Sequence, residues 1–246
     1  MKRIVVMILL CILLSSCAKA EPVQPVTEAA TPAVTEAPTE APTEAPTQSV
    51  IIAPTEPALL PEPEDGELVR IIDYLPSARE ELAYATDGNF TGQQIYDFYN
   101  AYLRYGTVKK LAPVCAELEE MGLGILIWDG FRPVSAQAAL WNICPDARYV
   151  SHPVTGTRAH CRGNAVDLTL VDLETGEKLE MPTGFDDFSA MADRNYSDCS
   201  DTPAENARLL EDVMKKHGFK PYSAEWWHYT DTESYPVAED FEPPVG

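Results

Sequence analysis

The strongest constraint on the fold is a division of the chain near residue 66. All 22 aromatic residues lie at or after Tyr74 and all 13 glycines at or after Gly66, whereas 10 of the 21 prolines lie between residues 18 and 65. A segment without aromatic residues buries too little apolar surface to offset the entropy that it loses on ordering. We therefore expect a folded domain only in residues 66–246, a length that suits a single domain.

The first 16 residues have the pattern of a secretory signal. Lys2 and Arg3 precede an apolar run over residues 4–14, which is too short to span a bilayer. The sequence Leu-Ser-Ser-Cys then ends at Cys17 and resembles the lipobox of bacterial lipoproteins. This resemblance implies that residues 1–16 are removed and that Cys17 carries lipid. An ordinary secretory signal with an incidental cysteine is the alternative.

Residues 17–65 are expected to form a disordered tether behind the lipidated cysteine. The four-residue repeat Thr-Glu-Ala-Pro occurs three times between residues 35 and 46. Frequent proline favours polyproline II at ~3.1 Å per residue, so full extension reaches roughly 150 Å. We expect a protein that is lipid-anchored on the extracytoplasmic face of a bacterial membrane, with its domain held away from the lipid.

Charge and cysteine usage limit the partners and the compartment. Lys+Arg 18 against Asp+Glu 39 gives a net charge of −21, which argues against nucleic acid as a partner. Cys115, on an apolar helical face, is expected to be a buried thiol. Export permits disulfides, and the polar loops around Cys144 and Cys199 favour a disulfide between these two residues.

Apolar spacing and turn residues predict a mixture of helices and strands. We expect strands over residues 68–73, 124–128 and 165–171, and a last strand or turn over 225–230. Helices are expected over 93–104, from about 108 to 121, over 135–141 and over 203–217, the last one with a capping box formed by Thr202 and Glu205. No regular β-α-β alternation is present, which predicts an α+β domain with a mainly antiparallel sheet flanked by helices.

Two short stretches combine residue types that bind metals. His160 precedes Asp167 by seven positions, and Glu225 precedes His228 by three. Two imidazoles and one carboxylate form a common catalytic zinc set that leaves a position for water. Residues an odd number of positions apart point to opposite faces of a strand, so a turn at Gly163 must bring His160 to the face of Asp167. A bend is needed between Glu225 and His228 as well. The alternative is that the two histidines are purely structural.

Several motifs in one order resemble the VanX-type D-alanyl-D-alanine dipeptidases, within the zinc D-Ala-D-Ala metallopeptidases. The matching stretches are Tyr84-Ala85-Thr86, Asn89-Phe90-Thr91-Gly92, Trp128-Asp129-Gly130-Phe131-Arg132-Pro133, His160 to Leu170, Phe185-Asp186 and Glu225-Trp226-Trp227-His228-Tyr229. The resemblance implies the zinc D-Ala-D-Ala peptidase/Hedgehog-like fold and one Zn²⁺ per chain. It makes His160, Asp167 and His228 the zinc ligands.

The same resemblance assigns the catalytic and substrate-binding residues. Glu225 is expected to be the general base, and Arg132 to stabilise the oxyanion of the tetrahedral intermediate. Asp186 and Tyr84 are expected to hold the free amino group of the dipeptide, with the neighbouring Asp187 as the alternative carboxylate. This chain departs from the family in having Arg158, where a serine is usual two positions before the first zinc histidine.

These expectations lead to a zinc dipeptidase that acts on D-Ala-D-Ala or a similar D,D-dipeptide in cell-wall turnover or salvage. A D,D-carboxypeptidase acting on peptidoglycan stem peptides is the alternative within the enzyme class. A zinc-containing wall-binding module without catalysis is the alternative from another class, although such a module needs neither Glu225 nor Arg132.

Overall fold

The structure is a computed structural model that describes residues 62–245. The expected signal of residues 1–16, the expected lipid attachment site Cys17 and all but the last four residues of the tether expected over residues 17–65 lie outside the described residues. Within the described part of the chain, no helix is long and apolar enough to cross a membrane.

A five-stranded sheet forms the centre of the domain. Its strand order is β2 (Arg79–Glu80), β4 (Leu123–Asp129), β5 (Ala165–Asp172), β7 (His228–Asp231) and β6 (Phe219–Pro221). Only the β2–β4 pair is parallel, which confirms the expected mainly antiparallel sheet. A separate antiparallel pair joins β1 (Leu68–Arg70) to β3 (Tyr102–Arg104).

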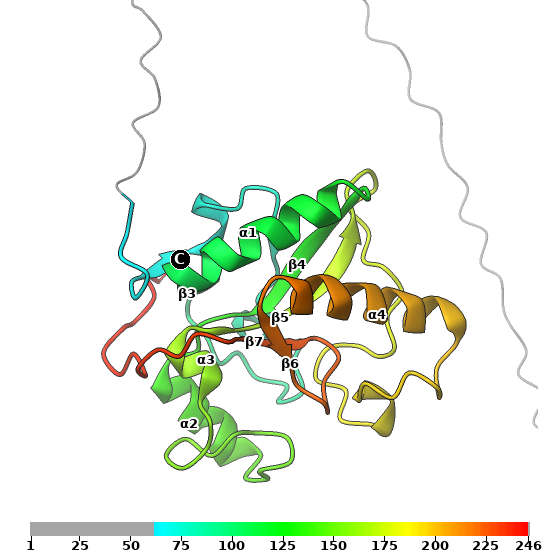
Figure 1. Ribbon diagram of the computed structural model, residues 1–246. Helices are drawn as coiled ribbons and strands as arrows, with labels where there is room; N and C mark the ends of the chain where they lie inside the picture. The colour runs from blue at the N-terminus through cyan, green and yellow to red at the C-terminus, as the bar shows by residue number, and fades with distance from the viewer. Residues whose placement is uncertain (1–61, 246) are drawn as a thin grey trace, which may run out of the picture. The chain divides into compact units, whose positions relative to one another are not determined.

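Helices α1 (Tyr105–Glu119) and α4 (Asp201–Lys216) contact each other, and both pack on the central sheet (Figure 1). The shorter helices α2 (Val134–Ile143) and α3 (Ala159–Arg162) lie together at the other end of the domain. Three short 3₁₀ turns complete the described elements: η1 (Ile71–Asp73), η2 (Ala83–Ala85) and η3 (Ala190–Ala192).

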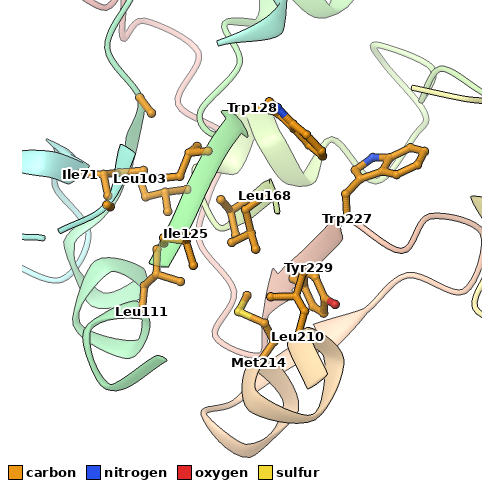
Figure 2. Packing of buried hydrophobic residues seen from close by; sticks show 14 of the residues in the cluster. Ile71, Leu103, Leu111, Ile125, Trp128, Leu168, Leu210, Met214, Trp227 and Tyr229 are labelled. Carbon is orange, nitrogen blue, oxygen red and sulfur yellow. The ribbon is translucent and has the colours of Figure 1, made fainter. Parts of the chain in front are cut away.

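The core lies between the helices and one face of the sheet. Figure 2 shows Leu111 of α1 beside Ile125 of β4, and Leu210 and Met214 of α4 beside Tyr229 of β7. Helix α4 is amphipathic because its buried side chains recur at helical spacing, at Ala204, Ala207, Leu210, Val213 and Met214. Val166, Leu168 and Leu170 of β5 point to this core, so the intervening Asp167 must point to the opposite face.

A bulge in β4 changes which residues face away from the core. Ile127 pairs with Leu168, but the register shifts after it so that Asp129, rather than Trp128, pairs with Asp167. A bulge adds one residue to one strand and therefore reverses the alternation of its side chains beyond that point. Asp129 thereby joins Asp167 on the face of the sheet opposite the helices.

Three predicted helices differ from the observed structure. Helix α1 begins at Tyr105, three residues earlier than expected, and ends at Glu119. The helix expected over residues 93–104 is absent, and β3 occupies its end. Tyr96, Phe98 and Leu103 are buried in this segment, and Tyr96 and Phe98, two positions apart, stack at 4.5 Å as side chains of an extended chain do. Helix α4 begins two residues earlier than expected, with Ser200 as its N-cap, so the capping box at Thr202 is not formed.

The cysteines of the described part are all free. Cys144 and Cys199 are half-buried thiols packed against the core, so the disulfide expected between them is absent from the structure. Flanking polar residues indicate a loop but do not determine whether two loops meet at the 4.4–6.8 Å Cα separation that a disulfide needs. The buried thiol expected at Cys115 is confirmed, and burial raises its pKa to about 12.

Candidate metal centre and catalytic cavity

Strand pairing places two of the expected zinc ligands side by side. Asp167 of β5 and His228 of β7 are direct cross-strand partners on the face away from the core. Such partners have Cβ atoms only about 4.5–5.5 Å apart. The Nδ1 atom of His228 lies 2.9 Å from Oδ1 of Asp167.

The third expected ligand comes from the loop before β5. His160 lies on the short helix α3, which is bounded by two residues in the left-handed conformation, Arg158 at φ 50° and Gly163 at φ 71°. A Cβ atom at position 163 would lie 2.5 Å from a methyl group of Leu68, so both the conformation and the close packing require glycine. The turn expected at Gly163 is thus confirmed, and it brings Nε2 of His160 to 3.4 Å from Oδ2 of Asp167.

The donor atoms fit a small cation of the zinc type. Nε2 of His160 lies 3.2 Å from Nδ1 of His228, and the three donor atoms all lie within 4.8 Å of one another. Tetrahedral ligands about 2.0–2.2 Å from a zinc ion are about 3.3–3.5 Å apart, close to these separations. Two nitrogens and one carboxylate also match the ligand types that zinc prefers.

Hydrogen bonding around His160 favours a cation at the same place. The Nδ1–H group of His160 donates to the carbonyl oxygen of Gly130 at 2.8 Å, which leaves a lone pair on Nε2 of the neutral ring. The lone pair of Nε2 therefore faces the carboxylate oxygens of Asp167. Two groups that only accept hydrogen bonds repel each other at this distance unless a positive charge lies between them. Burial acts to lower the pKa of His160, but the carboxylates of Asp167 and Asp129 outweigh it and raise that pKa. Burial acts to raise the pKa of Asp167, and His160 and His228 hold it well below its ordinary value.

Glu225 lies on the turn that precedes β7. The amide of His228 donates to the carbonyl oxygen of Glu225 at 3.4 Å, which confirms the bend expected between these residues. The carboxylate oxygen Oε2 of Glu225 lies 3.8 Å from Nδ1 of His228, beside the donor cluster rather than within it. Burial raises the pKa of Glu225 to about 7. A carboxyl group with this pKa exchanges protons readily near neutral pH.

Buried hydrogen-bond partners hold the side chain of Arg132, which lines the same cavity as the donor cluster. Its Nε and Nη2 atoms donate to Oδ2 of Asp129 at 3.1 and 2.6 Å, and Nη1 donates to Gln137 at 3.0 Å. Oδ1 of Asp129 accepts from the hydroxyl of Tyr96 at 2.8 Å. Sequence patterns alone indicate no role for Asp129 or Gln137, although Asp129 lies three positions before Arg132 in the same motif.

The two residues expected to bind the substrate amine contact each other. The hydroxyl of Tyr84 donates to Oδ2 of Asp186 at 2.7 Å. Burial raises the pKa of Asp186 to about 7, and the residue has a positive φ of 55°. Asp187 is exposed and its carboxylate accepts from the amide of Ser189 at 2.8 Å.

One cavity of about 630 Å³ brings these groups together. Its lining includes Arg132, His160, Asp167, Asp186, Glu225 and His228. Asp187 does not line the cavity, so Asp186 is the residue of the two whose carboxylate can contact a ligand there. Tyr84 does not line the cavity either and contacts the Asp186 carboxylate from outside it. Arg158 lines the cavity and pairs with Glu239 at 3.3 Å.

A donor set of two imidazoles and a carboxylate, next to a separate carboxyl group in a cavity, is the arrangement of a zinc hydrolase. Residues 64–242 match the D-ala-D-ala dipeptidase family of the M15 peptidases, and the chain belongs to that family. The resemblance drawn from the sequence motifs is thereby confirmed.

Relatives and solved structures give the range of similarity. The D-alanyl-D-alanine dipeptidase of Escherichia coli (strain K12) is 36% identical over 176 residues, which cover 71% of this chain and 90% of that protein. The D-alanyl-D-alanine dipeptidase of Enterococcus faecalis (strain ATCC 700802 / V583) is 32% identical over 178 residues, 64% of this chain and 87% of that protein. The solved structure of VanYB in complex with D-Alanine-D-Alanine is 17% identical with a TM-score of 0.36, over 57% of this chain and 74% of that one.

Proposed function

We propose that this chain is a zinc dipeptidase that hydrolyses D-alanyl-D-alanine or a similar D,D-dipeptide. The observation that carries the proposal is the single cavity in which the donor atoms of His160, Asp167 and His228 converge beside the carboxylates of Glu225 and Asp186. Family membership and relatives of that name at 32–36% identity support the same activity.

His160, Asp167 and His228 would hold the zinc ion. When bound, the ion supplies a Lewis acid that polarises the scissile carbonyl group and makes water more acidic. Glu225 accepts the proton of the attacking water and transfers it to the leaving amine. Its raised pKa of about 7 suits both steps, because the group is neither a strong acid nor fully ionised near neutral pH.

Arg132 stabilises the oxygen that becomes negatively charged as water attacks. Three of its five N–H groups are used by Asp129 and Gln137, and these contacts hold the guanidinium at the cavity wall before substrate arrives. Fixed donors of this kind are worth roughly 10²–10³ in rate. The remaining N–H groups are available to the oxyanion.

Asp186 binds the ammonium group of the substrate and so selects a free dipeptide. A dipeptide presents its ammonium group one residue from the scissile bond, whereas an N-acylated stem peptide has a neutral amide there. The carboxylate of Asp186 in the cavity suits such an ammonium group and so favours a dipeptidase over a D,D-carboxypeptidase. The hydroxyl of Tyr84 orients this carboxylate.

Release of D-alanine by the zinc-loaded protein tests the proposal. We expect hydrolysis of D-Ala-D-Ala, strong loss in Glu225→Ala, and normal activity in the control Glu174→Ala, whose side chain is exposed and does not line the cavity. Equal activity in wild type and Glu225→Ala, or no activity in either, would refute the proposed function. Faster hydrolysis of N-acetyl-D-Ala-D-Ala than of the free dipeptide, with Asp186→Ala still active, would instead establish the carboxypeptidase.

We further propose that the enzyme is lipid-anchored through Cys17 on the extracytoplasmic face of a bacterial membrane and acts in wall turnover or salvage. The basic and apolar start, the Leu-Ser-Ser-Cys sequence and the proline-rich residues 17–65 support this location. Metabolic labelling with an alkyne fatty acid should mark the wild-type protein but not Cys17→Ser. Equal labelling of the two proteins would exclude this anchor.

A further inference from the structure

The turn that carries Glu225 and His228 is weakly held by its own backbone. It connects β6 to β7, and its internal N–H···O distances are long: 3.2 Å from Tyr222 to His228, and 3.4 Å for both Glu225 to Tyr222 and His228 to Glu225. Hydrogen bonds between backbone N–H and C=O groups are most often about 2.9–3.0 Å. Contacts from outside the turn must therefore contribute to its conformation.

Arg194 supplies such contacts to both ends of the turn. Its Nε atom donates to the carbonyl oxygen of Tyr222 at 2.7 Å, and Nη2 donates to the carbonyl oxygen of His228 at 3.0 Å. The backbone amide of Arg194 donates to the carbonyl oxygen of Ser223 at 3.1 Å. One side chain thus bridges the residue that starts the turn and the histidine that ends it.

Three further side chains contact the guanidinium group itself. Nη1 lies 3.1 Å from Oε2 of Glu211 on α4 and donates to the hydroxyl groups of Tyr229 at 3.1 Å and Tyr196 at 3.3 Å. The guanidinium carbon also lies 4.5 Å from the centre of the Tyr229 ring. The Arg194 side chain is only 9% exposed, so these contacts are shielded from water. A planar guanidinium held at this many points has little freedom to move.

We propose that Arg194 is a positioning residue for the metal centre. It acts through the carbonyl groups of Tyr222 and His228 to keep Nδ1 of His228 and the Glu225 carboxylate in place. Partners that orient a metal ligand typically change metal affinity 10–100-fold when removed. The catalytic part of this inference rests on the proposed function, while the effect on zinc binding does not.

The test compares Arg194→Gln and Arg194→Lys with the control Glu211→Gln. The control weakens the brace around Arg194 but leaves both bonds to the turn intact. Lysine keeps the positive charge but cannot bridge two carbonyl groups as the guanidinium fork does. Zinc affinity is measured by competition with a chromogenic chelator, alongside kcat and KM for D-Ala-D-Ala and the thermal midpoint.

We expect both Arg194 variants to bind zinc roughly 10–100-fold more weakly than Glu211→Gln. We also expect kcat to fall with little change in KM, because Arg194 does not line the cavity that binds substrate. A general loss of stability would lower the thermal midpoint of all three variants without separating their zinc affinities. If Arg194→Gln does not fold, Arg194→Lys carries the same comparison.

The possible failures are distinguishable. If the Arg194 variants match Glu211→Gln in zinc affinity and in kcat, the positioning role is overturned. The proposed dipeptidase activity is unaffected by that result. Weaker zinc binding in the Arg194 variants of a protein that releases no D-alanine would support the positioning role and refute the proposed activity.

Discussion

Replacing Asp186 by asparagine should stabilise the zinc-free protein, and more strongly as the pH rises. Burial raises the pKa of this carboxyl group from 3.8 to about 7. The unfolded chain therefore releases the proton at a lower pH than the folded chain does. The contribution of the protonated carboxyl group to the free energy of unfolding is fully present below the unfolded pKa of 3.8. It is lost as the pH rises through the folded pKa of about 7.

The magnitude follows from the two pKa values. A shift of about three pKa units corresponds to about 4 kcal/mol in all, an upper bound for a group that borders a cavity. Roughly 2–3 kcal/mol of this loss falls between pH 5 and pH 8. Asparagine has no carboxyl proton to lose, it can accept the Tyr84 hydroxyl hydrogen bond through its amide oxygen, and it tolerates the φ of 55° at this position.

Thermal unfolding after chelator treatment measures the effect. The midpoint of Asp186→Asn minus that of wild type should increase by about 5–10 °C between pH 5 and pH 8. The exposed neighbour provides the matched control, since Asp187→Asn should show no such increase. A midpoint difference that is the same at both pH values would refute the argument that burial of this carboxyl group destabilises the fold.

Three further predictions concern the turn, the metal and the cysteines. Gly163→Ala should destabilise the protein by about 1–3 kcal/mol in urea unfolding and weaken zinc binding. The reason is that this residue has φ 71° and a Cβ atom would lie 2.5 Å from Leu68. An unchanged urea midpoint would contradict the need for glycine at this turn. Zinc at 1,000 times its Kd should stabilise wild type by about 4 kcal/mol but not His228→Ala, and equal stabilisation of the two would exclude His228 as a ligand. A phosphine reductant should leave the thermal midpoint of the zinc-free protein unchanged because Cys144 and Cys199 are free, and a lower midpoint with reductant would indicate a disulfide.

The relative positions of the expected zinc ligands His160 and Asp167 were predictable because they depend on the spacing of residues close together in the chain. Asp167 alternates with core residues of β5, and the glycine at position 163 signals the turn that carries His160 to the same face. The prediction of a helix around Tyr96 is wrong because the apolar residues of this segment fit both the helical and the strand periodicity, and only their tertiary contacts distinguish the two. Arg194 gave no sequence signal, since the carbonyl groups of Tyr222 and His228 that it contacts lie 28 and 34 positions away.

The sequence by itself determined which strands and helices form most of the described domain and which residue types could bind zinc. Those properties depend on composition and local spacing. The tertiary structure decided that Asp186 and not Asp187 reaches the cavity, that the bulge in β4 places Asp129 behind Arg132, and that Cys144 and Cys199 are free thiols. These features depend on contacts between segments distant in the chain, and only packing of the whole domain selects among the arrangements that local spacing allows.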